Sequence, residues 1–404
     1  MRTSNLNRLL RHTAPHRFLL LCLPFTASCS EGSVPEPCAE LPTRTVLVYL
    51  AGDNNLEEIG RTPELLRQGW KDTGSKCLIY YDAPQAAPKL FALTIRHSDA
   101  SSVLETVEEY PEENSSSAGV FGRVLADVVR KYPSDSYGLI FASHGSGWLP
   151  CGALSDPTRT IGDDRTPGTT GGAREMEITD FAAAIPDHQF DFIIFEACLM
   201  SGIEVAYELR NKTDYLLASS AELLVPGYAP VYPTAFQYLF DTSLGVPQAL
   251  EKFAGSYFNY IDTRNGAYRS ATQSIVYTRE MDALAILAGK TTGNTHGRWD
   301  DALLGKLQHF DRPGSYGDIP ARPRYFDFGQ YMAYLAPERQ AELDALLRKT
   351  VVWKAATPEF MAGYNGFTIL THSGLTTYIE QDEFPELNAA YKKTAWWKAT
   401  HVQK

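Results

Sequence analysis

Cysteine is scarce in this chain, with six residues among 404, and no two of them form a C-x-x-C pair. So few cysteines do not make a disulfide scaffold, and nine histidines scattered without metal-ligand spacing give a zinc site little support. An excess of basic residues is also missing, because the net charge is −11 and the isoelectric point is about 5.4. A surface that binds nucleic acid or an anionic membrane is therefore not expected, whereas basic peptides would be attracted.

The apolar stretch near the N-terminus, Phe18–Phe25, is too short to cross a bilayer. Four arginines and no acidic residue precede it, which is typical of a secretory signal rather than a membrane anchor. Small residues at 26–28 then lead directly into Cys29, and this segment resembles the cleavage box of bacterial lipoproteins. We expect a signal sequence over residues 1–28 and a lipid on Cys29.

Two outcomes remain open at this N-terminus. The lipoprotein box commonly has leucine three residues before the cysteine, where this chain has Thr26, so ordinary secretion after Ala27 or Ser28 is the alternative. With the lipid, the protein would be exported and anchored to a bacterial outer membrane, on its periplasmic or cell-surface face. The lipid would then be its only contact with the membrane.

No Gly/Ser-rich linker, long charge run or internal repeat divides the chain after residue 45. A content of 44% hydrophobic and 21% charged residues is that of a globular protein. We expect one large domain over residues 44–404, with a C-terminal extension from about residue 240, and an extended tether over residues 29–43. A disulfide between Cys38 and Cys77 is conceivable in an exported protein and stays open.

Short apolar strands alternate with helical patterns through the first half of this domain. Strands are predicted at Arg44–Leu50, Cys77–Tyr81, Tyr137–Ala142, Phe190–Phe195 and Tyr215–Ser219, with an edge hairpin from Phe91–Thr94 and Ser102–Val107. Helices are predicted at Leu56–Trp70, Ala118–Lys131, Ile178–Ile185 and Gly202–Arg210. Near-continuous apolar strands separated by helices indicate an α/β fold with a mostly parallel central sheet covered on both faces.

Two predicted strands run directly into reactive side chains. His144 follows the strand that ends at Ala142, and Cys198 follows the strand that ends at Phe195. Because the carboxyl ends of parallel strands meet at one edge of a sheet, neighbouring strands would bring His144 and Cys198 within reach of each other. An imidazole and the N-terminus of the helix predicted after Cys198 would both favour a reactive thiolate.

The segment around the histidine also offers a way to stabilise a transition state. Gly145 has no side chain, so a substrate carbonyl could approach its backbone, and the N–H groups of Gly145 and Cys198 could hold a developing oxyanion. His144 would take the thiol proton or deliver a proton to a leaving amine. A serine hydrolase using Ser143 or Ser146 is a poor alternative, because no G-x-S-x-G elbow is present.

Taken alone, a cysteine after a buried strand is more often a small core residue, and a histidine in a glycine-rich turn is more often structural. Together, each at the end of an apolar strand and with histidine first, they are harder to explain as packing. The order is that of caspases, whose cysteine lies in a Q-A-C segment, where this chain has Glu196-Ala197-Cys198. A non-catalytic surface lipoprotein that binds peptide or glycan in such a cleft is the main alternative.

Four segments resemble successive motifs of the clostripain-like peptidases: Val46–Glu57 (VLVYLAGDNNLE), Ser143–Trp148 (SHGSGW), Glu196–Leu209 (EACLMSGIEVAYEL) and Ala218–Tyr228 (ASSAE and PGY). The resemblance covers nearly all of residues 44–400. It implies a caspase/haemoglobinase-like αβα sandwich and a dyad of His144 and Cys198. It also implies endopeptidase activity, often after basic residues, on a peptide or protein substrate.

This chain departs from the family at positions that bear on specificity. Members with basic specificity commonly have Asp two residues before the nucleophile, where this chain has Glu196. The acidic run after the next strand is here Ser219-Ser220-Ala221-Glu222, with one acid only. We expect Glu196, Ser219 and Glu222 to contribute to substrate binding, with Glu222 at the wall of the S1 pocket. The alternative for Glu222 is a solvated surface carboxylate, so a preference for Arg or Lys is a hypothesis.

The loop from Leu149 to Glu175 is long for a connection without secondary structure, and such loops are often functional or cleavable. Several clostripain-like peptidases mature by cleavage between the histidine and the cysteine. Here Arg159, Arg165 and Arg174 are candidate sites of self-cleavage, and an uncut active-site lid is the alternative.

Calcium is the one cofactor that the resemblance suggests, since some relatives require it. Asp163 and Asp164, with nearby Asp156, are the candidate ligands, although no EF-hand spacing is present. The other expected partner is the substrate itself. We expect no nucleic-acid partner and a monomeric protein.

Overall fold

The structure is a computed structural model that describes residues 43–154, 161–165, 175–292, 301–315 and 320–401. The expected signal sequence, Cys29 and Cys38 lie outside the described residues, as do Asp156, Arg159 and Arg174. In the part of the chain that is described, no helix is both long and apolar enough to span a bilayer.

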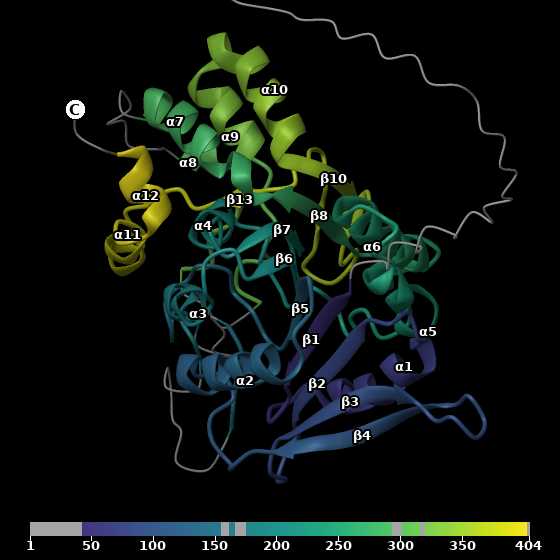
Figure 1. Cartoon of the computed structure of the whole chain (residues 1–404). Coiled ribbons are helices and arrows are strands. Elements are labelled where there is room, and N and C mark those ends of the chain that lie inside the picture. Colours follow the sequence, from purple (N-terminus) through teal and green to yellow (C-terminus); the bar gives the residue numbers. More distant parts are fainter. Residues whose placement is uncertain (1–42, 155–160, 166–174, 293–300, 316–319, 402–404) are drawn as a thin grey trace, which may run out of the picture. The chain divides into compact units, whose positions relative to one another are not determined.

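A nine-stranded sheet forms the centre of the molecule, in the order β10-β8-β7-β6-β5-β1-β2-β3-β4 (Figure 1). Its strands are β1 (Arg44–Ala51), β2 (Lys76–Asp82), β3 (Lys89–Ile95), β4 (Ser102–Glu109), β5 (Ser136–Ala142), β6 (Phe190–Glu196), β7 (Thr213–Ala218), β8 (Thr272–Tyr277) and β10 (Val351–Ala356). The five strands β2-β1-β5-β6-β7 pair in parallel, and the two strands at each end of the order are antiparallel. The predicted α/β fold with a mostly parallel sheet is confirmed.

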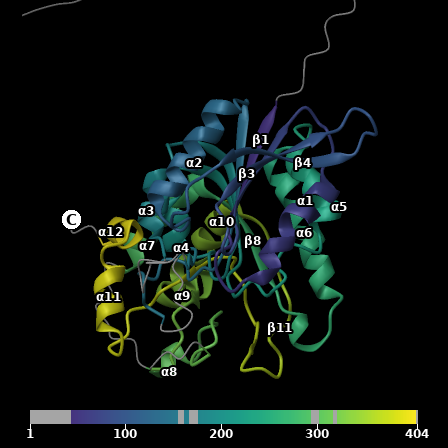
Figure 2. The same ribbon diagram turned by 90° about the horizontal axis from the view of Figure 1, so that it is seen from below.

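Helices cover both faces of this sheet. They are α1 (Thr62–Gly69), α2 (Ala118–Lys131), α3 (Ile178–Ala184), α4 (Ile203–Glu208), α5 (Tyr232–Ala235), α6 (Val246–Asp262), α7 (Met281–Thr292), α8 (Asp301–Leu304), α9 (Phe328–Leu335), α10 (Gln340–Thr350), α11 (Pro385–Tyr391) and α12 (Ala395–Thr400). Figure 2 shows α1, α5 and α6 on one face and α2 and α3 on the other. Two small antiparallel pairs complete the fold: β9 (Phe326–Asp327) with β13 (Thr376–Thr377), and β11 (Glu359–Phe360) with β12 (Phe367–Thr368).

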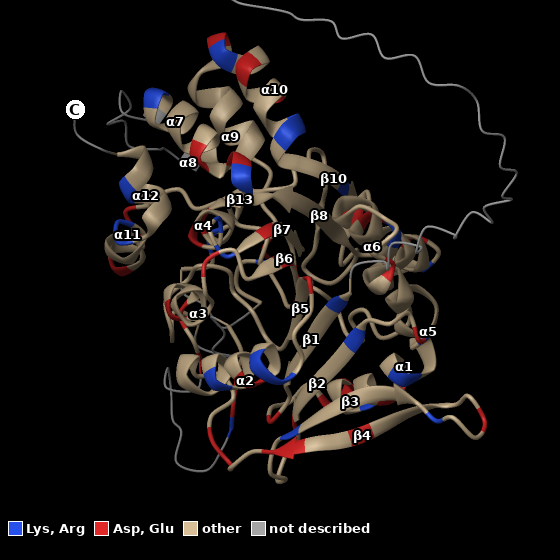
Figure 3. Ribbon diagram, viewed as in Figure 1, with Lys and Arg blue, Asp and Glu red and all other residues tan. Residues whose placement is uncertain are grey.

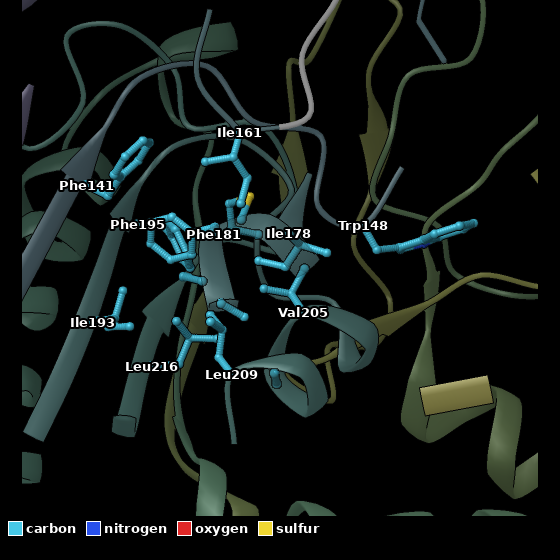
Figure 4. Packing of buried hydrophobic residues seen from close by; sticks show 14 of the residues in the cluster. Phe141, Trp148, Ile161, Ile178, Phe181, Ile193, Phe195, Val205, Leu209 and Leu216 are labelled. Carbon is cyan, nitrogen blue, oxygen red and sulfur yellow. The ribbon is translucent and has the colours of Figure 1, made fainter. Parts of the chain in front are cut away.

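The alternation of side chains along β6 shows why both faces need cover. Phe192 and Ile194 belong to the core under α1, α5 and α6, whereas Ile193 and Phe195 belong to the core under α2 and α3. Successive side chains of a strand point to opposite faces, so an uninterrupted apolar strand is stable only between two layers. Figure 4 shows Phe195 packed beside Phe181 in the second of these cores. Fully burying one such side chain contributes about 1.5–3 kcal/mol.

The outer strand β4 differs from the central strands in charge. Glu105 and Glu109 are exposed on it, and the acidic residues are visible along this edge in Figure 3. An edge strand has unpaired backbone N–H and C=O groups that could pair with a strand of another chain. Charged side chains on the edge strand discourage such pairing. The predicted edge hairpin from residues 91–94 and 102–107 is confirmed as β3 and β4.

The C-terminal region differs from the predicted elements at two places. The spacing of apolar residues over Glu338–Val352 predicts one helix, but the helix ends at Thr350, because Val351 begins β10 and pairs with β8. The sequence also predicts one helix over Tyr391–Ala399, but α11 ends at Tyr391 and α12 begins at Ala395. Thr394 caps the second helix, since its hydroxyl accepts a hydrogen bond from Trp397 N at 3.1 Å.

Candidate active site

The carboxyl ends of β5 and β6 form one junction. Ala142 is paired with Glu196 in the parallel register, and Ser143 N donates to the carbonyl oxygen of Glu196 at 3.3 Å. His144 lies two residues beyond Ala142, and Cys198 lies two residues beyond Glu196. The two candidate catalytic residues therefore leave adjacent strands at the same height of the sheet edge.

Gly145 allows the two strand ends to touch. A Cβ atom on Gly145 would lie 2.7 Å from the carbonyl oxygen of Cys198 and 3.1 Å from the sulfur of Met200. The first distance is shorter than any real contact of a Cβ atom, and the backbone oxygen has no flexible side chain that could move away. Glycine is thus required here so that the histidine segment can lie against the cysteine segment.

His144 is held by a residue that the sequence did not single out. Its Nε2 lies 2.7 Å from Oδ1 of Asn55, which follows β1. Because an amide oxygen only accepts, the neutral ring donates from Nε2, and Nδ1 is left as the nitrogen that can take a proton. The neighbouring Asn54 fixes this loop by donating to the carbonyl oxygens of Ala51 at 2.8 Å and Asp163 at 3.0 Å. The signal in the sequence was the D-N-N that follows a strand at this same edge.

Cys198 is half-buried and receives a backbone donor. Leu223 N, in the segment after β7, donates toward Cys198 Sγ at 3.4 Å. This N–H group favours the thiolate, whereas the carbonyl oxygen of the same residue, 3.8 Å from Sγ, can accept from the thiol. The helix whose N-terminus was expected to favour the thiolate is short and distant. It is α4, which begins only at Ile203, five residues beyond the cysteine. The dipole of a helix acts mainly within its first turn, so Leu223 N is the more direct source of stabilisation.

The backbone just after the cysteine is strained. Leu199 has φ of +62°, in the left-handed region that residues other than glycine rarely adopt. This conformation is held by Leu199 N donating to Ala221 O at 2.9 Å and by Ser201 N donating to Ser219 O at 3.0 Å. Such strain persists only where surrounding contacts impose it, and it is common at functional sites.

Glu196, the last residue of β6, is half-buried beside the junction. Its Oε1 accepts from Tyr228 N at 2.7 Å, and its Oε2 accepts from the hydroxyl of Tyr232. Burial raises the pKa of Glu196 to about 7, although these two donors oppose the rise. Gly227 lies beside it with φ of +61°, a conformation that residues other than glycine rarely adopt.

Glu222 is neither open to solvent nor without a partner. Its carboxylate receives a two-pronged ion pair from Arg312, with Nε to Oε1 at 2.9 Å and Nη2 to Oε2 at 2.8 Å. The side chains of Glu222 and Arg312 are only 12% and 15% exposed. Glu222 is therefore not a solvated surface carboxylate. As the expected wall of the S1 pocket, it is already paired with the cationic side chain of Arg312.

Ser219 is buried, and its hydroxyl is 2.9 Å from that of Thr272 on β8. Its contribution in the structure is to hold the segment after β7 in place.

The segment Ile161–Arg165 lies along the residues that follow β5. Gly162 N donates to the carbonyl oxygen of His144 at 3.0 Å, and Arg165 N donates to that of Asp53 at 2.8 Å. Ile161 is buried in the core, and Figure 4 shows it above Phe181. His144, whose carbonyl oxygen this segment contacts, is only 3% exposed.

The candidate calcium ligands have other partners. Asp163 pairs with Arg165 at 3.3 Å, and Oδ2 of the buried Asp164 accepts from the hydroxyl of Ser115 at 2.8 Å. Among the residues that the structure describes, no group of three or more His, Cys, Asp or Glu side chains is placed to hold a metal ion. Asp163 and Asp164 therefore do not fit a calcium site, and no chemical step below uses one.

The sequence of this chain matches that of a known protein family. The sequence model of the Clostripain family matches residues 48–287, which include the ends of both β5 and β6. The chain belongs to the clostripain family.

Individual proteins are also similar to this chain in sequence and structure. The chain is 26% identical over 290 residues to clostripain of Hathewaya histolytica, covering 64% of this chain and 52% of that protein. It thus spans about half the length of that relative. A crystal structure described as an inactive zymogen C11 protease from Parabacteroides distasonis is 29% identical, with a TM-score of 0.72, over 89% of this chain and 98% of the other.

A second solved structure of the family adds a bound ligand. It is a secreted C11 cysteine protease from Bacteroides thetaiotaomicron in complex with an irreversible peptide inhibitor, 26% identical with a TM-score of 0.73. The match covers 89% of this chain and 98% of that one. Similarity in structure therefore extends past residue 287 into the C-terminal region of this clostripain-family protein.

Proposed function

We propose that this clostripain-family protein is a cysteine endopeptidase in which Cys198 is the nucleophile and His144 transfers protons. The observation that carries the proposal is the junction at which Gly145 lies against the Cys198 backbone. The Asn55 contact leaves Nδ1 of His144 as the basic nitrogen, and Leu223 N favours the thiolate. The domain over residues 44–404 would be the catalytic unit.

The proposed reaction proceeds through an acyl-enzyme. His144 takes the proton of the Cys198 thiol, and the thiolate attacks the carbonyl carbon of the peptide bond. The bond between carbon and nitrogen then breaks as His144 delivers that proton to the leaving amine. Water then attacks the thioester, His144 accepts a proton from it, and the thiolate is released. The backbone N–H groups of Gly145 and Cys198 are the proposed donors to the oxyanion in both steps.

Glu196 is the proposed acid that selects the substrate residue before the cleaved bond. It lies two residues before the nucleophile, and its two donors, Tyr228 N and the Tyr232 hydroxyl, carry no charge. A carboxylate buried among neutral donors attracts a cation strongly, since little water screens it. This supports cleavage after Arg or Lys, whereas Glu222 is already neutralised by Arg312.

Covalent labelling tests the proposed function directly. A peptide chloromethyl ketone ending in arginine should modify the wild-type protein at Cys198, as located by mass spectrometry, and should leave Cys198→Ala unlabelled. Cys151, which is half-buried, serves as the internal control for non-specific thiol reaction. If wild-type protein under reducing conditions is not labelled and hydrolyses no peptide in a mixed library, the peptidase proposal fails and the binding-protein alternative is favoured.

We further propose export and a lipid on Cys29, with residues 29–43 as the tether. The basic and apolar residues before Cys29 support this, and one structural relative is described as secreted. Metabolic labelling with a palmitate analogue should mark the wild-type chain and not Cys29→Ser. Equal release of both chains into the soluble fraction would instead favour ordinary secretion.

A further inference from the structure

The ion pair between Glu222 and Arg312 lies beside the nucleophile. Ala221 accepts a hydrogen bond from the residue after Cys198, and Leu223 donates toward the cysteine sulfur, so Glu222 sits between two direct contacts of the nucleophile loop. A negative charge on Glu222 would therefore lie close to the proposed nucleophile.

Arg312 is anchored by the C-terminal region and not by the segment that it neutralises. It lies between α8 and β9, and its Nη1 donates to Tyr364 O, in the turn between β11 and β12, at 3.3 Å. Phe310, two residues before Arg312, packs with Phe360 and Ala221 in a small separate core. These contacts fix the guanidinium in place, so that its two-pronged geometry is maintained without substrate.

The surface next to the ion pair is apolar. Leu223 and Leu224 are half-buried, and Val225 is 56% exposed. With Glu222 neutralised, the only uncompensated carboxylate described here next to the nucleophile is Glu196. The site thus offers one position for a cationic side chain and, beside it, an apolar wall.

We propose that Arg312 is a specificity-determining residue that closes Glu222 to cationic side chains, so that the protein selects substrates with a single basic residue flanked by apolar residues over dibasic ones. The inference rests on the proposed function. A second basic side chain would meet the guanidinium of Arg312 and the apolar wall, and it would lose hydration without gaining a charged partner.

Four proteins and three quenched fluorescent peptides test this inference. The peptides carry Leu-Arg-Leu, Arg-Arg-Leu or Leu-Arg-Arg around one cleavage site. The proteins are the wild type, Arg312→Met, Glu222→Gln and the double variant. The measured quantity is the ratio of kcat/KM for each dibasic peptide to that for the monobasic one, with a melting curve for every variant.

Wild-type protein should favour the monobasic peptide. Arg312→Met should raise the dibasic ratio about tenfold, because an unneutralised carboxylate then becomes available to a cation. The double variant should return to the wild-type ratio, since its carboxylate is gone. An unchanged ratio in a folded, active Arg312→Met protein overturns the inference, as does a wild-type preference for dibasic peptides.

Breaking one side of a buried ion pair is destabilising. If Arg312→Met does not fold, a wild-type preference for the dibasic peptides still overturns the inference. Absence of both labelling at Cys198 and cleavage of all three peptides would instead be a failure of the proposed function. The two failures are therefore distinguishable.

Discussion

Asn55 Oδ1 lies 2.7 Å from His144 Nε2, joining the loop after β1 to the loop after β5. β1 and β5 are adjacent parallel strands, so their carboxyl ends emerge side by side. The contact fixes both the orientation of the imidazole and the nitrogen that carries the proton. Asn55 is thus a positioning residue for the proposed proton transfer, and it can be tested apart from the dyad.

Replacing Asn55 by alanine should lower kcat by about 10- to 100-fold, while KM changes little, because the imidazole loses its orientation and its fixed tautomer. The measurement is steady-state hydrolysis of a basic fluorogenic peptide across pH, in which the profile should also shift. Asn259→Ala, an exposed position on α6, is the matched control and should behave as wild type. An Asn55→Ala enzyme with the wild-type kcat and pH profile would show that Asn55 does not position His144.

Gly145→Ala should both destabilise the protein and abolish activity. The added methyl would lie 2.7 Å from a backbone oxygen of Cys198, and overpacking of this kind costs about 1–3 kcal/mol. Gly119→Ala in α2 is the control, since nothing lies within 4 Å of its added Cβ atom and alanine favours a helix by about 1 kcal/mol. Thermal melting should therefore move in opposite directions in the two variants, and parallel shifts would contradict the proposed contact.

The preference for basic substrates should rise with pH. Glu196 has a pKa of about 7 in the folded protein, so its carboxyl is neutral below that value and negative above it. The ratio of rates for an Arg substrate and a matched Gln substrate should increase between pH 6 and pH 8, about one unit on either side of that value. Glu196→Gln should give a low ratio that does not vary with pH, and Glu251→Gln, at an exposed position of α6, is the control. A wild-type ratio that is flat across this range would remove Glu196 from the specificity argument.

Asp82→Asn should stabilise the protein at alkaline pH. Asp82 is fully buried at the end of β2, and burial, with the charges of Asp164 and Glu112, raises its pKa to about 8, against a smaller lowering by Ser115. In the unfolded chain the value is about 3.9, so the wild type loses stability as pH rises from about 4 to about 8. Asparagine cannot ionise and avoids this loss.

Melting temperatures measured from pH 5 to pH 8.5 should therefore diverge, with Asp82→Asn at least about 2 °C above the wild type at the upper end. Asp180→Asn, an exposed position in α3, is the control and should run parallel to the wild type. Parallel curves for Asp82→Asn would mean that its carboxyl is accommodated as an anion.

Much of the central fold could be predicted because the apolar composition of the strands shows that they are buried. An uninterrupted apolar strand such as β6 needs cover on both faces, which implies helices on both sides and a parallel sheet. The C-terminal elements were harder to predict, because β10 and the division between α11 and α12 depend on local pairing and capping. A β-branched pair such as Val351-Val352 extends a helical pattern equally well until a partner strand is known.

The sequence by itself determined that a histidine and a cysteine each end an apolar strand, since that follows from local order along the chain. Only the tertiary structure decided their partners. Asn55 meets His144 because β1 lies beside β5, and Arg312 reaches Glu222 across 90 residues because the C-terminal region packs on the segment after β7. Strand order and packing set these contacts, and neither can be predicted from the spacing of residues along the chain.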